Sequence, residues 1–445
     1  MRRRLLYLLL VIPLLCLAGA AVYFLPPVHE RLSWRVENFR TQVRYALNPP
    51  DQALFVPQEP PQLDPLDLEP LVLMVEATLQ ALTPEANLVP VQAGPMPTET
   101  LPGPTATPPP TAAPTPIPTP IPASASLSGI RHEWQSFNNC GPANLSMALS
   151  YWGWSGSQVD TRLYLRPHPD DYNVMPEEML AFIETQTDLK ALLRFGGDLD
   201  LLKRLVAAGF PVILEKGLHP SDDWWMGHYV VASGYDDAWG RLITQDSLVM
   251  ADYPIPYEDV EERWWRDFNY LYLVIFPPER EAELIELLGP QADREQNLRH
   301  ALEVATRETQ TLSGRDLFFA WYNMGSSLVG LGEYGPAAEA FDQAFAVYQS
   351  IPEKDRPWRM GWYQVGPYQA YYHVGRYRDV INLADTTLGV FAKPPLEDSL
   401  YWRGLAKLDS GDREGAVEDF KRAVDLNLTF AYGKEELERL GVVYP

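Results

Sequence analysis

Cysteine is almost missing from this sequence: Cys16 and Cys140 are the two cysteines in a chain of 445 residues. A disulfide framework is excluded, because Cys16 lies in an apolar N-terminal run and cannot meet Cys140 once that run is in a membrane. Positive charge is scarce too, since 36 Lys and Arg stand against 59 Asp and Glu, a net charge of -23. Nucleic-acid binding needs basic patches, so this balance argues against it. No Gly-x-x-x-x-Gly-Lys-Ser/Thr loop occurs either, which argues against an ATPase.

The N-terminus has the pattern of a membrane anchor. Three arginines at positions 2–4 precede residues 5–25, an uncharged apolar run of about 20 residues, which is the length that crosses a bilayer as a helix. Because arginines beside a span stay on the cytoplasmic side, the rest of the chain is expected to be extracytoplasmic. The sequence therefore predicts a transmembrane anchor at residues 1–25 of a single-pass cell-membrane protein. A cleaved signal peptide is the alternative.

The 42 prolines are unevenly distributed. Residues 83–128 consist largely of Pro, Thr and Ala, and such a segment cannot bury a core and is expected to be extended. We predict that it is a linker, a stalk between the anchor and the globular part, after a juxtamembrane segment at residues 26–82. A Pro-rich ligand for another domain is the alternative.

Residues 129–277 show helical patterns first and strand-like runs afterwards. The helical patterns begin at Cys140 and continue near residues 176–185 and 199–208, and the strand-like runs are 210–215, 229–235, 241–245 and 270–276. This segregation predicts an α+β domain rather than alternating βαβ units.

Cys140 is the first candidate functional residue. Asn138 and Asn139 can cap a helix and Pro142 fits a first helical turn, so Cys140 is expected at a helix N-terminus. Unpaired N–H groups and the positive end of the helix dipole stabilise a thiolate there, which makes a cysteine nucleophilic. An ordinary buried cysteine is the structural alternative.

A cysteine nucleophile needs a general base, and His228 begins a strand-like run at residues 227–231. The next run, residues 241–246, follows a turn at 236–240, and antiparallel pairing across this turn is expected to place His228 opposite Asp246. A carboxylate that faces an imidazole fixes its tautomer and supports the imidazolium. The structural alternatives are that His228 is a packing residue and that Asp246 is a turn residue.

Two neighbouring features have other interpretations. A metal site formed by His219, Asp222 and Asp223 has no second histidine to complete it, so no metal or cofactor is expected. Trp224 and Trp225 precede His228 closely and are expected either to wall a substrate groove or to pack in the core.

Several segments stand in the order typical of papain-like peptidases: Gln135, 139–143, 209–213, 227–231 and Asp246. More narrowly, residues 130–277 resemble the cysteine peptidase domain related to bacteriocin-leader-processing (double-glycine) transporters, in its stand-alone form. The resemblance implies that Cys140 is the nucleophile, His228 the base, Asp246 the orienting group and Gln135 the oxyanion-hole donor beside the Cys140 backbone N–H. Two positions depart from the pattern. Gln135 precedes Cys140 by five residues where those relatives usually have six, and Ser247 stands where they often have proline.

Residues 278–445 are helical and Ala-rich, and two of their segments align. Trp321, Gly325, Gly332, Ala337, Phe341 and Ala344 match Leu400, Gly404, Gly411, Ala416, Phe420 and Ala423. Small residues let paired helices approach closely while the aromatic residue fills the gap, a pattern similar to tetratricopeptide repeats. We expect two good repeats and a degenerate one near Gly375, with a candidate helical pair at 279–312. Such repeats commonly bind peptides or partner proteins, and packing on the first domain is the alternative.

The sequence as a whole predicts an α+β papain-like cysteine peptidase domain, then an all-α repeat domain, behind a transmembrane helix and a Pro/Thr-rich stalk. The expected function is that of a membrane-anchored extracytoplasmic peptidase which hydrolyses peptide bonds through Cys140, His228 and Asp246 without a cofactor. A transpeptidase or amidase that uses the same acyl-enzyme, and an inactive peptidase-like scaffold, are the alternatives.

Overall fold

The computed structural model describes residues 121–168, 171, 173–219, 225–389 and 396–444, together with residues 54–58 and scattered positions between 19 and 47. The chain divides into two units, one of residues 1–61 with 122–445 and one of residues 62–121. Most of the expected anchor and of the expected linker lies outside the described residues. In the part of the chain that is described, no helix is both long and apolar enough to cross a membrane.

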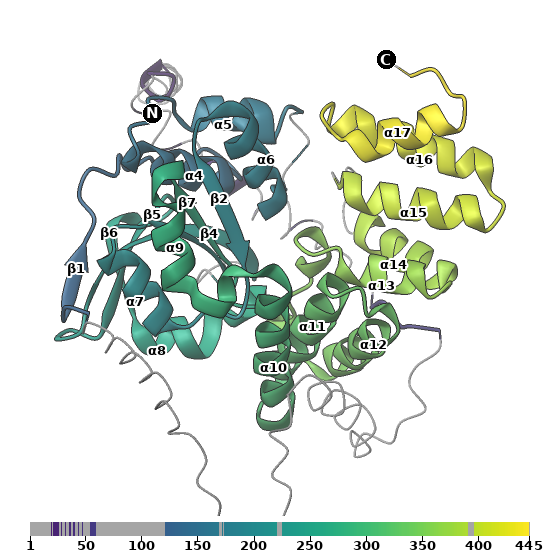
Figure 1. The fold of residues 1–445 in the computed structure, drawn as a ribbon. Helices are drawn as coiled ribbons and strands as arrows, with labels where there is room; N and C mark the ends of the chain where they lie inside the picture. Colours follow the sequence, from purple (N-terminus) through teal and green to yellow (C-terminus); the bar gives the residue numbers. More distant parts are fainter. Residues whose placement is uncertain are drawn as a thin grey trace, which may run out of the picture. The chain divides into compact units, whose positions relative to one another are not determined.

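Seven strands form one antiparallel sheet in the order β2-β7-β3-β4-β5-β6, and β1 pairs with β4 (Figure 1). The strands are β1 (Ser124–Ser126), β2 (Lys190–Arg194), β3 (Val212–Leu218), β4 (Met226–Asp236), β5 (Arg241–Asp246), β6 (Met250–Pro256) and β7 (Tyr272–Phe276). Because β1 belongs to the sheet, the predicted linker boundary at residue 128 is wrong. The folded domain begins before it.

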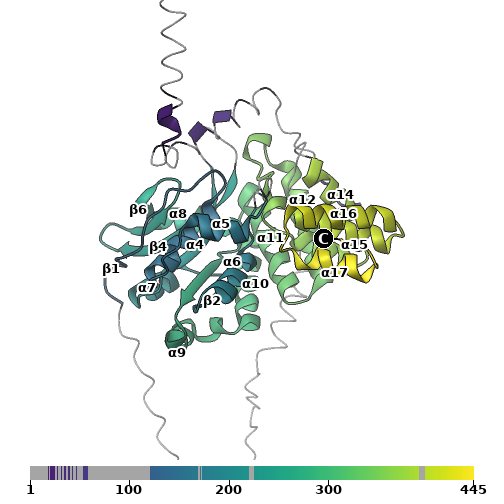
Figure 2. The ribbon, with the colours of Figure 1, turned by 90° about the horizontal axis from the view of Figure 1, so that it is seen from above.

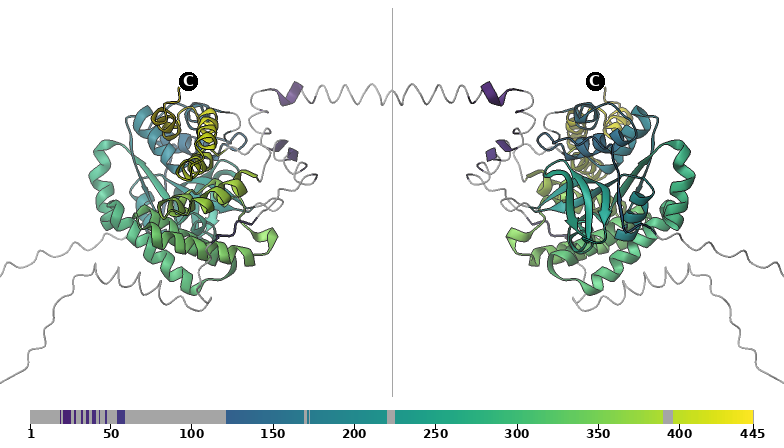
Figure 3. Two further views of the ribbon diagram at one scale, coloured as in Figure 1. Left: turned by 90° about the vertical axis from the view of Figure 1, so that its right-hand side faces the viewer. Right: turned by 90° about the vertical axis from the view of Figure 1, so that its left-hand side faces the viewer.

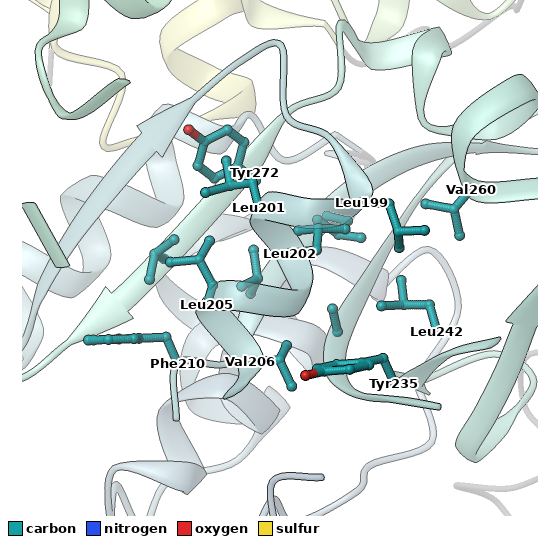
Figure 4. Close-up of a cluster of buried hydrophobic side chains, with 14 of the residues drawn as sticks. Leu199, Leu201, Leu202, Leu205, Val206, Phe210, Tyr235, Leu242, Val260 and Tyr272 are labelled. Atoms are coloured by element: carbon teal, nitrogen blue, oxygen red, sulfur yellow. The ribbon is translucent and has the colours of Figure 1, made fainter. Parts of the chain in front are cut away.

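Helices cover both faces of this sheet (Figure 2), and its antiparallel pairing agrees with the expected α+β class. One face holds α4 (Cys140–Tyr151), α5 (Gln158–Leu165) and α6 (Pro176–Gln186), and the other holds α7 (Leu199–Ala207). Strand residues alternate between the two cores, since Ile213 packs with the α4 side while Val212 and Leu214 pack with the α7 side. Figure 4 shows the α7 side, where Leu202, Leu205 and Val206 pack among strand residues.

Most of the remaining elements of the described chain are helices. After the short α8 (Tyr257–Asp259) they are α9 (Glu281–Leu288), α10 (Arg294–Thr311), α11 (Gly314–Gly330), α12 (Tyr334–Ser350), α13 (Gly366–His373), α14 (Tyr377–Gly389), α15 (Glu397–Asp409), α16 (Arg413–Leu426) and α17 (Ala431–Arg439). Leu284 and Leu288 of α9 belong to the core on the α7 side of the sheet. Residues 279–312 thus form two helices before the repeats, as expected, but α9 packs in the core of the first domain, which extends past residue 277.

The close approach of paired helices occurs where the sequence predicts it. A Cβ added to Gly325 of α11 would lie 2.7 Å from the ring of Phe341 on α12. In the second repeat, a Cβ on Gly404 of α15 would lie 2.6 Å from the ring of Phe420 on α16. Each aromatic ring thus occupies the space that its glycine leaves.

The helical repeats lie against the sheet domain (Figure 3). At the centre of this contact is the buried Asp267, whose Oδ2 accepts a hydrogen bond from Trp225 Nε1 at 2.7 Å and pairs with Arg315. Asn323 Nδ2 donates to the carbonyl of Arg266 at 2.8 Å. The packing alternative for the repeats is therefore observed, and it leaves their other faces for binding.

Candidate active site

Cys140 is the first residue of α4, as predicted. Asn139 stands at the N-cap but makes no side-chain cap; its Nδ2 donates to Gln158 Oε1 at 2.8 Å instead. The capping prediction is therefore wrong, although the helix begins where it was expected. Residues 141–149 are all buried, while Cys140 is half-buried. The thiol thus lies at the positive end of a helix whose body is fixed in the core.

His228 and Asp246 form a buried pair in which Nε2 lies 2.9 Å from Oδ1, with side chains 2% and 1% exposed. The strand register differs from the predicted one. Val231 pairs with Gln245, and the ladder has an irregularity between Ala232 and Gly234, so one step further along the ladder brings Asp246 beside residue 230 rather than 228. Residues two apart share a face, so Asp246 still reaches His228 as a diagonal neighbour.

The turn after β5 fixes the Asp246 carboxylate. Its Oδ1 accepts the backbone N–H groups of Leu248 at 2.8 Å and Val249 at 3.1 Å, besides facing His228. Burial raises the pKa of Asp246, but the charge and hydrogen bond of His228, with the charge of Lys216, outweigh burial and lower this pKa to about 2. Asp246 is therefore ionised over the whole neutral range.

The same pair sets the charge state of His228 and Cys140. Burial lowers the pKa of His228, but the charge and hydrogen bond of Asp246 and the contact with Cys140 raise it to about 9. Burial raises the pKa of the Cys140 thiol, yet the hydrogen bond and charge of His228 and the N–H groups of Tyr229 and Gly141 bring it below its ordinary value. Because Nε2 of His228 faces Asp246, Nδ1 is the ring nitrogen that is left to contact the Cys140 thiol. The arrangement favours a thiolate–imidazolium pair.

Gln135 lies beside this group and is 7% exposed. Its backbone N–H donates to the carbonyl of Ser247 at 2.9 Å, and Ser247 Oγ donates to Gln135 Oε1 at 2.8 Å. Since its amide oxygen is held by Ser247, the NH₂ end of the side chain is the end that can serve as an oxyanion donor. Ser247, a departure from the family pattern, is therefore the residue that orients Gln135.

Asn144 is a further residue of the site that the sequence analysis missed. It is fully buried, and its Nδ2 lies 2.9 Å from the carbonyl of Cys140, 2.7 Å from that of Tyr229 and 3.0 Å from Ser247 Oγ. One side chain therefore ties the start of α4 to β4 and to the turn that holds Gln135. A polar residue one helical turn after Cys140, on a face that is otherwise apolar, was the available signal.

The repeats also border the site. A Cβ on Gly227, next to His228, would lie 2.9 Å from the Tyr363 ring, and Arg359 Nη1 donates to the carbonyl of Trp225 at 3.1 Å. Trp225 is 1% exposed and packs among aromatic rings of both domains, so packing in the core is the one of its two expected roles that is observed. Trp224 lies outside the described residues, as do Asp222 and Asp223.

Parts of the chain match known protein families. Residues 127–271 match the Peptidase_C39 like family, and residues 320–350 and 397–430 match the tetratricopeptide repeat. Residues 127–271 are a peptidase C39-like domain. A solved structure described as a C39-like peptidase from Bacillus anthracis is similar at 17% identity and a TM-score of 0.30, covering 34% of this chain and 96% of that chain. No curated protein matches the sequence.

The C39-like domain includes all four predicted site residues. Its match ends at residue 271, just before β7, although β7 lies between β2 and β3 inside the sheet. The two repeat matches cover α12, α15 and α16 and most of α11, and α13 and α14 lie between them as the degenerate repeat expected near Gly375. The C39-like domain is thus followed by tetratricopeptide repeats.

Proposed function

We propose that the chain is a cysteine peptidase that hydrolyses peptide bonds with Cys140 as its nucleophile. The observation that supports this proposal is the chain of contacts from the Cys140 thiol through His228 to Asp246 inside a C39-like domain. A thiolate paired with an imidazolium is both a strong nucleophile and a ready proton donor. Neither the nucleophilic attack nor the proton transfer needs a metal or a cofactor.

The proposed reaction has two halves. Cys140 Sγ attacks the peptide carbonyl carbon, and the oxyanion is stabilised by the Cys140 backbone N–H and the Gln135 amide. His228 gives its proton to the leaving amine as the C–N bond breaks, which leaves a thioester on Cys140. His228 then takes a proton from water, whose oxygen attacks the thioester, and the acid product leaves as the thiolate–imidazolium pair forms again.

We further propose that the globular part is extracytoplasmic and held by the N-terminal segment, because three arginines precede the apolar run. The repeats then present a substrate or a protein partner to the site. Membrane fractionation, followed by protease treatment from outside the cell, tests the location: digestion of the C39-like domain is the expected result, and its protection would contradict the proposal.

Activity is tested by incubating the full chain with a complex peptide mixture and identifying new C-termini by mass spectrometry. Wild type and Cys16→Ala, the same change at the other cysteine, are expected to cleave, whereas Cys140→Ala and His228→Ala are not. Products that have gained an amine instead of water would indicate the transpeptidase, and release of ammonia from side-chain or terminal amides would indicate the amidase. An uncleaved mixture with folded wild-type protein would support the inactive scaffold.

A further inference from the structure

A short segment far from the repeats in sequence packs onto them. Residues 54–58 (Leu-Phe-Val-Pro-Gln) alternate in burial: Phe55 and Pro57 are buried, while Leu54 and Val56 are 39% and 50% exposed. They belong to no helix or strand. A period of two means that one side of an extended peptide faces the protein. The contact is therefore that of a docked peptide.

Phe55 enters a depression of the repeats that we call the repeat groove. Its ring centroid lies 4.8 Å from that of Phe345, nearly perpendicular at 77°, and 6.1 Å from that of Tyr371. A cavity of about 60 Å³ lies in the repeat groove beside Phe55, and its aromatic lining consists of Phe318, Tyr322, Phe345, Tyr348, Trp358 and Tyr368. Edge-to-face packing of this kind adds to the stabilisation that simple burial gives.

The carboxylate of Asp379 accepts a hydrogen bond from the backbone of the same segment. The backbone N–H of Gln58 donates to Asp379 Oδ1 at 3.0 Å, and Asp379 is 3% exposed. Arg376 holds the other oxygen of Asp379 at 2.8 Å and also pairs with Asp342 at 2.7 Å, so the acceptor is fixed before a peptide arrives. The repeat groove thus recognises an aromatic ring, a proline two residues later and a main-chain N–H one residue after that.

We propose that the repeat groove is a binding site for extended peptides with an aromatic-x-Pro pattern, and that residues 54–58 are an intramolecular cap which such a peptide displaces. The cap belongs to the same chain as the repeats, so its binding to the repeat groove is intramolecular. A partner peptide with the same contacts must overcome the effective concentration that this linkage gives the cap. The proposal is independent of whether Cys140 is catalytic.

Binding is tested with the full chain in detergent and a fluorescent peptide that copies residues 51–61. Phe55→Ala empties the repeat groove, so the labelled peptide should bind this variant at least tenfold more tightly than wild type in fluorescence anisotropy. Val56→Ala is the matched control, because Val56 is exposed in the same segment, and it should bind like wild type. A peptide in which the phenylalanine is alanine should not bind.

Hydrogen exchange gives a second readout that does not depend on Phe55→Ala being well folded. The Gln58 amide should be protected in wild type and lose protection when excess peptide is added, because the peptide takes its bond to Asp379. Pro57→Ala is a second cap variant and should raise peptide affinity by less than Phe55→Ala does. Equal affinity of Phe55→Ala and wild type, or unchanged Gln58 protection at saturating peptide, would overturn the cap. Absence of binding to both cap variants would overturn the peptide site.

Discussion

The role of Asp246 yields the sharpest prediction, for the variant Asp246→Asn. Asparagine keeps an oxygen for the N–H groups of Leu248 and Val249, so the turn after β5 should survive the change. What is lost is the negative charge facing His228 Nε2. Asp236→Asn is a matched control: Asp236 Oδ1 accepts the N–H groups of Ala238 and Trp239 in a similar turn at the other end of the hairpin.

The size of the effect follows from the charge state of His228. Its pKa of about 9, against an ordinary 6.5, corresponds to about 3 kcal/mol of imidazolium stabilisation at 1.36 kcal/mol per pH unit. Without the carboxylate, burial lowers this pKa against only the contact with Cys140, so the pKa should fall toward 6.5. At pH 8 the imidazolium fraction then drops from about 90% to about 3%, and the Cys140 thiolate loses its partner. Its alkylation by iodoacetamide at pH 8, followed by peptide mapping, should slow by on the order of 10-fold.

Alkylation reports on the thiolate without a known substrate, so the test does not depend on cleavage specificity. Asp236→Asn should alkylate at the wild-type rate over the whole pH range. An unchanged alkylation profile in Asp246→Asn, with an unchanged circular dichroism spectrum, would refute the claim that Asp246 maintains the charge pair. A slow rate already in wild type would mean that Cys140 is an ordinary thiol.

Three further predictions concern stability and the oxyanion donor. The raised pKa of His228 gives stability that is full below pH 6.5 and lost as pH rises through about 9, while the lowered pKa of Cys140 has the opposite slope. Urea denaturation of Cys140→Ala should therefore show stability falling above pH 6.5, with a flatter curve for wild type; parallel curves would contradict the charge pair. Gly325→Ala should lower the free energy of unfolding by about 1–3 kcal/mol in the same assay, because the new Cβ meets Phe341. Gly335→Ala places its Cβ in open space and should leave the free energy of unfolding unchanged. Equal losses in the two variants would refute the packing argument. Ser247→Ala releases Gln135, so it should reduce kcat about 10-fold while the alkylation rate of Cys140 stays unchanged. Ser233→Ala changes another buried serine and should leave kcat unchanged. Slower alkylation of Cys140 in Ser247→Ala would indicate a general disturbance of the site instead.

The start of α4 was predictable from sequence because its signals are local. Pro142 and the apolar spacing after Cys140 act within a few residues, and Cys140 is where they place it. The capping interaction was not predictable, since Asn139 has a competing partner in Gln158, which tertiary folding brings close. Local patterns thus give the position of an element, while the partners of its polar side chains are set by the fold.

The hairpin of His228 and Asp246 was predicted in kind but not in register. The irregularity between Ala232 and Gly234 shifts the pairing, and no turn signal in the sequence encodes it. The two residues still meet because the shift keeps them on one face. Pairing of β2 with β7 joins segments about 80 residues apart, so neither its order in the sheet nor the contacts of Ser247 and Asn144 could be read from spacing.

The docking of residues 54–58 also determines how tension enters the molecule. A pull on the N-terminal segment, which the proposed function holds in a membrane, reaches Phe55 and the repeats before it reaches β1 and the sheet. Residues 62–121 lie between these two attachments and carry no load while the first one holds. Once Phe55 leaves the repeat groove, residues 62–121 can span at most about 200 Å. Undocking of residues 54–58 therefore increases the distance that the C39-like domain can reach from the N-terminal segment.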